Sequence, residues 1–389
     1  MGLYVNRIRY KGGSPRLGAS SGVINNAVVD GYYFYDDNYN PPEIDYTKEY
    51  LTITSFEDNN TCTFSWYSGA QNINSVSYSK DKTNWTKTTS SGNINVYLNK
   101  GEKVYFKASV NYTSGFRYGA FDTTYSSFHC TKKWEVSGNL MSMVYEDNFI
   151  DKTTFRTVNE HCFLGFFCAG NYDVEGTTWA TLMSAKHFVC PITQITGTPH
   201  GCFARMFQHQ PLIYAPKEMI YNEGSTVPSN FFWGTFKDCT LLQETPLLNF
   251  TSFGSGTCTN CFNNASSLKR CKSYVGSGSS QQNFISATNG IFYIKNSSQT
   301  ASNKPSSWTT RYMEGTSFIS IWAETETPYD GIVAGCSDYF VAGDSVTLTY
   351  VAVNGTFAGY YDENDNLLSS NSTYTFTAQR SMKIKVKTT

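Results

Sequence analysis

The chain has 389 residues and a net charge of −1, from 30 lysine and arginine and 31 aspartate and glutamate residues. At about 150 residues per domain, this length predicts roughly two to four domains. The balanced charge argues against a nucleic-acid-binding protein, which needs a basic surface to neutralise phosphates. Aromatic residues are as frequent as charged ones, at 16% each, so we expect a neutral, polar surface rich in aromatic rings.

The sequence contains no sign of membrane insertion or export. No apolar run reaches the roughly 18 residues that span a bilayer. Arg7, Arg9 and Lys11 are not followed by the apolar segment of a signal peptide. We therefore expect a chain made in a reducing cytosol, without a signal peptide. Its 11 cysteines cannot all pair within the chain, and we expect them to be buried free thiols.

Residues 1–48 are predicted to be an N-terminal anchoring arm rather than a domain. The segment is too rich in glycine for a hydrophobic core and too aromatic for a solvated tail. An arm that becomes ordered on a partner fits both observations, because docking would bury its rings. A disordered leader is the alternative. The anchoring candidates are Tyr4, Tyr10, Tyr32, Tyr33, Phe34 and Tyr35.

Residues 49–137 are predicted to form a β-sandwich domain. Short alternating segments at roughly ten-residue spacing, separated by clusters of turn residues, are typical of such a domain. These segments are 50–56, 62–66, 76–78, 95–98 and 103–107. Residues 79–85 resemble the hairpin box of sialidases, which is a folding element rather than a catalytic one, although its usual glycine is missing here.

Residues 138–315 are predicted to be an array of repeats. Four aromatic-rich units each close with a phenylalanine, at intervals of 40, 29 and 26 residues. The closing residues are Phe167, Phe207, Phe236 and Phe262. One short unit cannot bury its own apolar side, whereas stacked copies bury it against each other. The irregular stretch 276–310 is expected to cap the array.

The position four residues before each closing ring is also apolar. It is occupied by Phe163, Phe203, Phe232 and Cys258. Residues i and i+4 lie on one side of a helical turn. Each unit is therefore predicted to be one short helix or turn that places two side chains in the core. Scattered core aromatic residues, the alternative, would not keep this register.

Residues 316–389 return to a β pattern and are predicted to be a small β domain. Alternation extends over residues 345–350, 357–361, 374–377 and 382–386. Residues 362–366 begin like a calcium-binding loop. However, Leu367 stands where the loop needs glycine and Thr373 where it needs glutamate, so we expect a hairpin turn.

Two of the repeats resemble a known repeat unit that runs roughly as Cys-Tyr-x-x-Met-Phe-x-x-Cys-x-x-Leu-x-x-x-Pro. The matching residues are Cys202, Phe203, Met206, Phe207, Leu212 and Pro216 in one unit, and Phe232, Phe236, Cys239, Leu242 and Pro246 in the next. This pattern resembles the BspA-type leucine-rich repeats of gut Bacteroidetes and of the crAss-like phages that infect them. The array departs from that family in its uneven spacing and in the replaced residues at 257–262.

The flanking segments strengthen the resemblance. Residues 50–137 resemble the β domain that commonly precedes such arrays, and residues 316–389 resemble an internalin-type B repeat, with matches at 343–348, 357–360 and 366–369. The resemblance implies a mainly β, multidomain fold: a β-sandwich, then an irregular leucine-rich-repeat solenoid with short helices, then a small β domain. It implies adhesion and structure, not catalysis.

Motifs for metal binding and catalysis are weak. Cys258 and Cys261 form one C-x-x-C pair, with Cys239 and Cys271 nearby, but a structural zinc site usually needs two such pairs. The chain has no phosphate-binding glycine loop and no nucleophile elbow. We expect no enzyme, no metal and no cofactor. A carboxylate pair assembled from distant loops leaves a carbohydrate-active enzyme open.

We therefore expect a structural protein of a phage virion, either a head fibre or a tail-associated appendage, that adheres to host or mucosal glycans. Its partners would be other virion proteins, and we expect a homo-oligomer, with a trimer favoured. A bacterial cell-surface adhesin is the alternative. The predicted binding residues are Tyr360, Tyr361, Trp233 and Tyr214.

Overall fold

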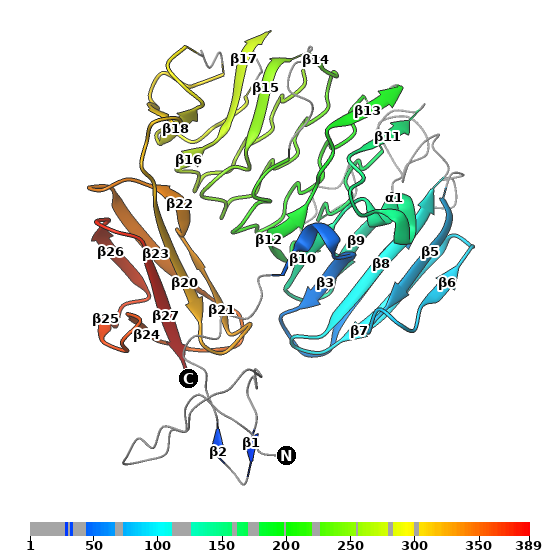
Figure 1. Ribbon diagram of the computed structural model, residues 1–389, viewed down its shortest axis with the longest axis horizontal. Coiled ribbons are helices and arrows are strands. Elements are labelled where there is room, and N and C mark those ends of the chain that lie inside the picture. Colours follow the sequence, from blue (N-terminus) through cyan, green and yellow to red (C-terminus); the bar gives the residue numbers. More distant parts are fainter. Residues whose placement is uncertain are drawn as a thin grey trace, which may run out of the picture. The chain divides into compact units, whose positions relative to one another are not determined.

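The computed structural model describes residues 28–29, 32–33, 44–66, 73–110, 126–157, 162–169, 179–197, 200–219, 226–253, 256–278, 283–298 and 303–389 (Figure 1). The chain divides into two compact units, Met1–Asp45 and Tyr46–Thr389. In the first unit, β1 (Val28–Val29) pairs antiparallel with β2 (Tyr32–Tyr33). The described residues are mainly β, which confirms the predicted mainly β fold.

Two sheets pack face to face in the segment predicted to be a β-sandwich. The first has, in spatial order, β12 (Leu182–Val189), β10 (Trp134–Asn139), β3 (Leu51–Ser55), β8 (Lys103–Val110), β5 (Ile73–Ser79) and β6 (Thr86–Thr88). The second has β7 (Gly92–Leu98), β4 (Asn60–Trp66) and β9 (Ser127–Cys130). Phe106 of the first sheet meets Phe128 of the second, with ring centroids 4.8 Å apart. Alternation of side chains puts such rings on the inner faces.

The array continues the first of these sheets. Strand β12 comes from the predicted array but pairs in parallel with β10, opposite β3. The predicted boundary between residues 137 and 138 falls inside β10. One hydrophobic core extends from Leu51 to Trp308, so the sandwich and the array fold around a common interior. Short helices lie beside the sheet: η1 (Tyr46–Lys48), α1 (Ser142–Tyr145) and η2 (Glu146–Asn148).

The aromatic-rich units are rows of consecutive turns rather than short helices. In one row, Gly201, Arg205 and His209 all have positive φ, between 56° and 62°, and such a residue every four positions is incompatible with a right-handed helix. Within this row, Met206 N donates to Phe203 O (3.3 Å), while Phe203 N donates to Phe231 O of the next row (2.9 Å). Some backbone N–H groups of a row therefore close turns within that row, and others donate to carbonyl groups of the next row.

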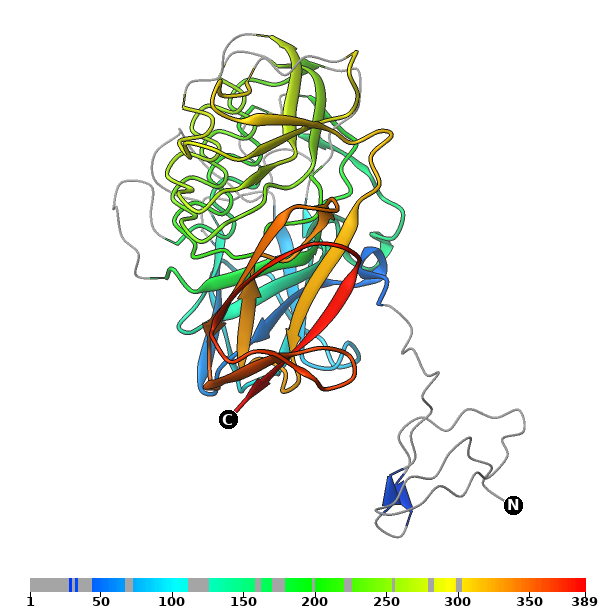
Figure 2. The same cartoon turned by 90° about the vertical axis from the view of Figure 1, so that its left-hand side faces the viewer.

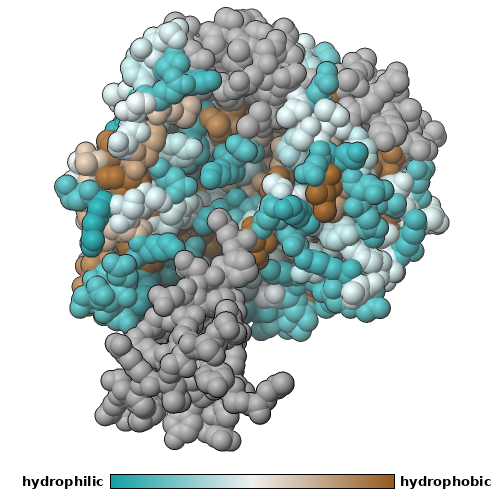
Figure 3. All heavy atoms as spheres, viewed as in Figure 1, coloured by the Kyte–Doolittle hydropathy of each residue, from teal (hydrophilic) through white to brown (hydrophobic). Residues whose placement is uncertain are grey.

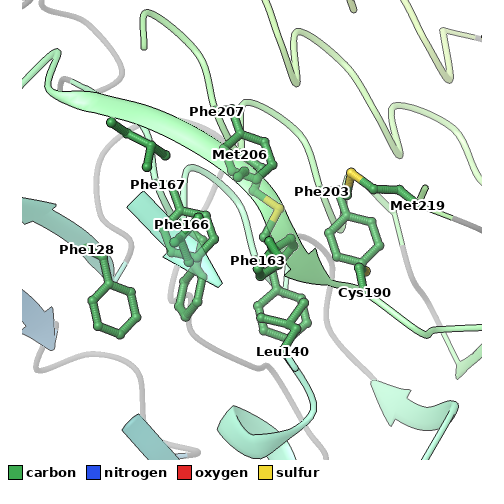
Figure 4. Close-up of a cluster of buried hydrophobic side chains, with 14 of the residues drawn as sticks. Phe128, Leu140, Phe163, Phe166, Phe167, Cys190, Phe203, Met206, Phe207 and Met219 are labelled. Atoms are coloured by element: carbon green, nitrogen blue, oxygen red, sulfur yellow. The ribbon is translucent and has the colours of Figure 1, made fainter. Parts of the chain in front are cut away.

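Two columns of stacked phenylalanine rings run through the rows (Figure 4). The first contains Phe163, Phe203 and Phe232. The second contains Phe167, Phe207, Phe236 and Phe262, with centroids 5.2–5.4 Å apart. Phe128 of β9 stacks on the first ring of the second column, and Phe284 meets its last ring edge-on. The four-residue register predicted from the sequence is thus the register of the core.

Parallel strands lie along another side of the rows, and Figure 2 shows the green and yellow coils lying side by side. The strands are β11 (Thr154–Thr157), β13 (Gln194–Gly197), β14 (Thr226–Val227), β15 (Leu248–Phe253), β16 (Arg270–Cys271), β17 (Ser273–Gly278), β18 (Ile291–Ile294) and β19 (Thr309–Tyr312). They pair as β11-β13, β14-β15-β17 and β16-β18-β19, all in parallel. Part of the predicted cap, residues 276–310, therefore continues this pairing.

The C-terminal segment has a hydrophobic core of its own, from Ile319 to Val386. One sheet contains β22 (Ser337–Phe340), β20 (Ile319–Thr325), β27 (Met382–Thr388), β24 (Phe357–Tyr361) and β25 (Leu367–Ser369). The other contains β21 (Gly331–Ala334), β23 (Ser345–Ala352) and β26 (Thr373–Thr377). The predicted hairpin turn at residues 362–366 is confirmed: Asp365 N donates to Asp362 O (3.1 Å) between β24 and β25.

A charged cluster joins this C-terminal module to the array. The carboxylate of Glu244 accepts from Arg270 Nε (2.6 Å) and from Lys272 Nζ (2.7 Å), and the Ser337 hydroxyl of β22 donates to it as well. Burial opposes ionisation of Glu244, but Lys272 and Arg270 outweigh it and hold the pKa of this carboxyl below its usual range. The contact between the module and the array therefore includes a buried ion-pair network beside an apolar cluster that contains Met183, Ile213 and Ala334.

Candidate functional site

The structure does not bring the four predicted binding residues together. Trp233 lies in the third row of turns, half-buried, with the Arg205 guanidinium 4.2 Å from its ring centre. Tyr361 lies on β24 with the Lys387 ammonium 4.4 Å from its ring centre. Tyr214 packs against the C-terminal module, where its hydroxyl donates to the Val333 carbonyl.

Tyr360 does not fit a binding role. Its side chain is fully buried in the C-terminal core, and its hydroxyl donates to the Ser372 carbonyl (2.9 Å). The alternation of β24 turns Tyr360 inward and its neighbour Tyr361 outward. The prediction of Tyr360 as a binding residue is therefore wrong. Its ring is a core element and presents no face to a ligand.

The predicted anchoring arm lies mostly outside the described residues. Tyr32 and Tyr33 form β2, and Tyr33 pairs with Val28. Tyr4, Tyr10, Phe34 and Tyr35 lie outside the described residues.

The most distinctive surface is the outer face of the sheet β7-β4-β9. The residues that point away from the core form three cross-strand rows. These rows are Asn93, Ser65 and Ser127; Asn95, Thr63 and His129; and Tyr97, Thr61 and Thr131. Thr63 Oγ1 donates to Asn95 Oδ1 (2.8 Å), which fixes the middle of the face. We call these nine residues and Trp179 the polar face.

Aromatic rings stand at two margins of the polar face. Tyr97, on β7, is 73% exposed, the largest fraction among the exposed large hydrophobic residues of the described chain. Across the sheet, the ring of Trp179 stacks on His129, with centroids 4.2 Å apart and planes 19° apart. Thr181 Oγ1 donates to the Cys130 carbonyl of β9 (2.9 Å), which holds the Trp179 segment against this strand.

The strands of the polar face carry no charge. Strands β4, β7 and β9 contain no aspartate, glutamate, lysine or arginine. Burial lowers the pKa of His129, so the imidazole is neutral at pH 7. The face therefore offers amides, hydroxyls and rings, a set of groups suited to a neutral, hydroxyl-rich ligand.

The polar face leads into the rows of turns. Phe128 N of β9 donates to Phe166 O in the first row (2.8 Å), and the hydrogen bonds between rows continue to the row of Trp233. Backbone hydrogen bonds therefore connect β9 of the polar face, through the first and second rows of turns, to the row that contains Trp233. Figure 3, in the view of Figure 1, shows a largely hydrophilic surface with hydrophobic residues in small separate groups.

Among the described residues, the side chains that usually bind metal ions are not clustered. No group of three or more histidine, cysteine, aspartate or glutamate side chains among them is placed to hold a metal ion. Cys258 and Cys261 are fully buried in the core, as expected from their repeat positions. All 11 cysteines are buried. In the described part of the chain, no helix has the length and apolar character needed to cross a membrane.

Comparisons with known proteins give no relative for this chain. No protein-family model matches it, and neither a curated protein nor a solved structure shows a match.

Sequence reasoning found the strand that carries Tyr97 but not the polar face. Residues 95–98 alternate and were predicted as a strand, so the outward direction of Asn95 and Tyr97 followed from the sequence. The pairing of β4 with β7 and β9 did not, because it joins residues far apart in the chain. The position of Trp179 over His129 has no local sequence signal.

Proposed function

We propose that this chain is a structural appendage protein of a phage virion, a head fibre or tail-associated component, that binds host or mucosal glycans through the polar face. The observation that carries glycan binding is an uncharged strip of amides and hydroxyls between exposed Tyr97 and the Trp179–His129 stack. Aromatic rings offer flat apolar faces to the C–H groups of sugars, while amides and hydroxyls bond the sugar hydroxyls.

The dimensions of the polar face suit an oligosaccharide. Adjacent strands lie about 4.8 Å apart and residues i and i+2 about 6.8 Å apart, which places Tyr97 and His129 roughly 12 Å from each other. That span fits a short run of linked sugars with a ring stacked at each end. The hydrogen-bonded sheet also keeps the aromatic and polar groups fixed before binding, which reduces the entropy lost on association.

The rows of turns support the finer fold proposal of a leucine-rich-repeat-type solenoid. Their parallel pairing, their two ring columns and their 26- to 40-residue intervals are what stacked repeats produce. Such an array is stiff along its length, because every row is hydrogen-bonded to its neighbours. Stiffness suits a component that holds a binding face away from its attachment point.

We assign attachment to residues 1–48, whose rings would dock on other virion proteins. The proposed assembly is a homo-oligomer, with a trimer favoured, because appendages follow the closed symmetry of the particle. The separate first unit, Met1–Asp45, supports a role for this segment apart from the rest of the chain. No catalytic residue, cofactor or metal enters the proposal.

The experiment is a glycan-panel screen with the purified full chain and two matched variants. Tyr97→Ala should weaken binding to every recognised glycan at least tenfold, while Tyr312→Ala should leave binding unchanged, because Tyr312 is 42% exposed on β19, outside the polar face. Thermal unfolding checks that both variants stay folded. Equal binding by wild type and Tyr97→Ala, or glycan cleavage without retained binding, would overturn the proposal.

A further inference from the structure

Two cysteines lie opposite each other on the inner side of the polar face sheet. Cys62 of β4 and Cys130 of β9 are cross-strand partners in an antiparallel pair, and both are fully buried. Both also belong to the common core. Since side chains at paired positions point to the same face, the two thiols share one site in the interior.

The hydrogen-bond register makes this an unusually close pair. Thr131 N donates to Thr61 O (3.1 Å), so Thr61 and Thr131 form a hydrogen-bonded pair. In antiparallel sheets the next pair is then non-hydrogen-bonded, with Cα atoms about 4.5 Å apart. Disulfides need Cα atoms roughly 4.4–6.8 Å apart. Cys62 and Cys130 therefore meet the backbone requirement without any strand movement.

A second neighbouring thiol pair lies in the rows of turns. Cys162 and Cys202 occupy equivalent positions in adjacent rows, where Phe163 stacks on Phe203, and their thiols also lie close together. This pair does not belong to an antiparallel ladder, so no strand register fixes the distance between its Cα atoms as the pairing of β4 with β9 does for Cys62 and Cys130.

Burial keeps the pair reduced until oxidant reaches it. Burial, with a smaller contribution from Cys62, raises the pKa of the Cys130 thiol well above its usual value, so the reactive thiolate is scarce in the closed fold. Oxidation would therefore proceed during folding, before the two thiols are buried.

We propose that Cys62 and Cys130 are an oxidation site that forms a cross-strand disulfide when the protein meets a disulfide oxidant. One thiolate attacks the disulfide of the oxidant, for which oxidised glutathione serves, and releases one thiol. The second cysteine then attacks the mixed disulfide and releases another. The two protein thiols lose two electrons, and their two protons end on the two glutathione thiols.

The disulfide would covalently link two strands of the polar face on the inner side of the sheet. It ties the strand of His129 to the strand of Thr63, both of which lie on that face. The bond closes a long loop, so it restricts the unfolded chain and raises stability. The inference rests on the sheet register alone and stands whether or not the face binds glycans.

The test maps thiols in the full chain refolded from a reduced, denatured state in a buffer of reduced and oxidised glutathione. Alkylation followed by peptide mapping without reduction should find a Cys62–Cys130 link, and the thermal midpoint should rise by several degrees and return after dithiothreitol. Refolding removes the barrier of burial, so a failure to link cannot be ascribed to slow access.

Variants assign the link. Cys130→Ala should abolish the cross-link and the dithiothreitol-sensitive shift in midpoint, while Cys162→Ala should preserve both. If Cys130→Ala does not fold, the wild-type map decides alone. Eleven free thiols after refolding at an oxidising potential, or a link between any other pair in place of Cys62–Cys130, would overturn the inference.

Discussion

The ring of Phe236 lies parallel to that of Phe262, with planes 8° and centroids 5.3 Å apart, and it meets Phe207 on its other side at 13° and 5.2 Å. Each ring therefore contacts one neighbour from the row before and one from the row after. Adjacent rows are therefore held together both by ring stacking and by backbone hydrogen bonds. Loss of a middle ring breaks two contacts at once.

Phe236→Ala should lower the free energy of unfolding by about 3–5 kcal/mol, because Phe236 is fully buried and its removal leaves a cavity within the column. Phe236→Leu, which keeps most of the volume, should cost about half as much. Urea unfolding measures both. A loss below about 1 kcal/mol for the alanine variant would place Phe236 outside the core.

Glu244→Gln should separate the C-terminal module from the array. The substitution leaves Arg270 and Lys272 without their carboxylate in a buried contact, and breaking such a network typically costs about 3–5 kcal/mol. Calorimetry should show the unfolding of the module at a lower temperature than that of the array. Glu218→Gln, at an exposed position, is the control and should leave a single profile unchanged. An unchanged profile for Glu244→Gln would mean that the network does not couple the two parts.

Glu135 should make stability fall as pH rises. Burial raises the pKa of Glu135 to about 7, against the opposing effects of Lys103 and Lys186. Its ordinary pKa is about 4.5, so between about pH 4.5 and 7 the folded state holds more protons than the unfolded state; the free energy of unfolding therefore falls across that range and levels off above pH 7, where both states are ionised.

The variant Glu135→Gln cannot ionise. It should match the wild type near pH 4 and exceed its free energy of unfolding by about 2–3 kcal/mol at pH 8. Chemical unfolding across this range measures the difference, and Glu363→Gln, on an exposed turn, controls for the general effect of removing a carboxylate. A difference between Glu135→Gln and wild type that does not vary with pH would contradict the raised pKa.

A chain that begins at Tyr46 should fold with an unchanged thermal midpoint, because Tyr46–Thr389 is a compact unit with its own cores. The same truncation should no longer join the particle if residues 1–48 anchor the protein. Circular dichroism and particle incorporation measure the two outcomes. Aggregation of the truncated chain would show instead that the first segment completes the fold.

The spacing of residues close together in the sequence predicted the rows of turns. It did not predict the pairing of strands that are far apart in the sequence. The four-residue interval between Phe232 and Phe236 shows directly in the sequence, and it is the interval between the two ring columns. The sequence could not decide between a helix and consecutive turns, since either places residues i and i+4 on one side. Positive φ at non-glycine residues such as Arg205 settles it, and no sequence rule places arginine there.

Binding residues were harder to predict than core residues. Tyr360 and Tyr361 are adjacent and chemically identical, and only the strand phase separates the buried ring from the outward one. Tyr97 was within a predicted strand, yet its importance depends on the distant Trp179–His129 stack. Tertiary pairing, rather than any local pattern, assembles the polar face.

The most direct test of the proposed role is immunogold electron microscopy of purified phage particles with an antibody against this chain. The account predicts label on the capsid or on the tail, with the polar face accessible to glycan. Bare particles, with label on the bacterial surface instead, would contradict it and identify the chain as a cellular adhesin.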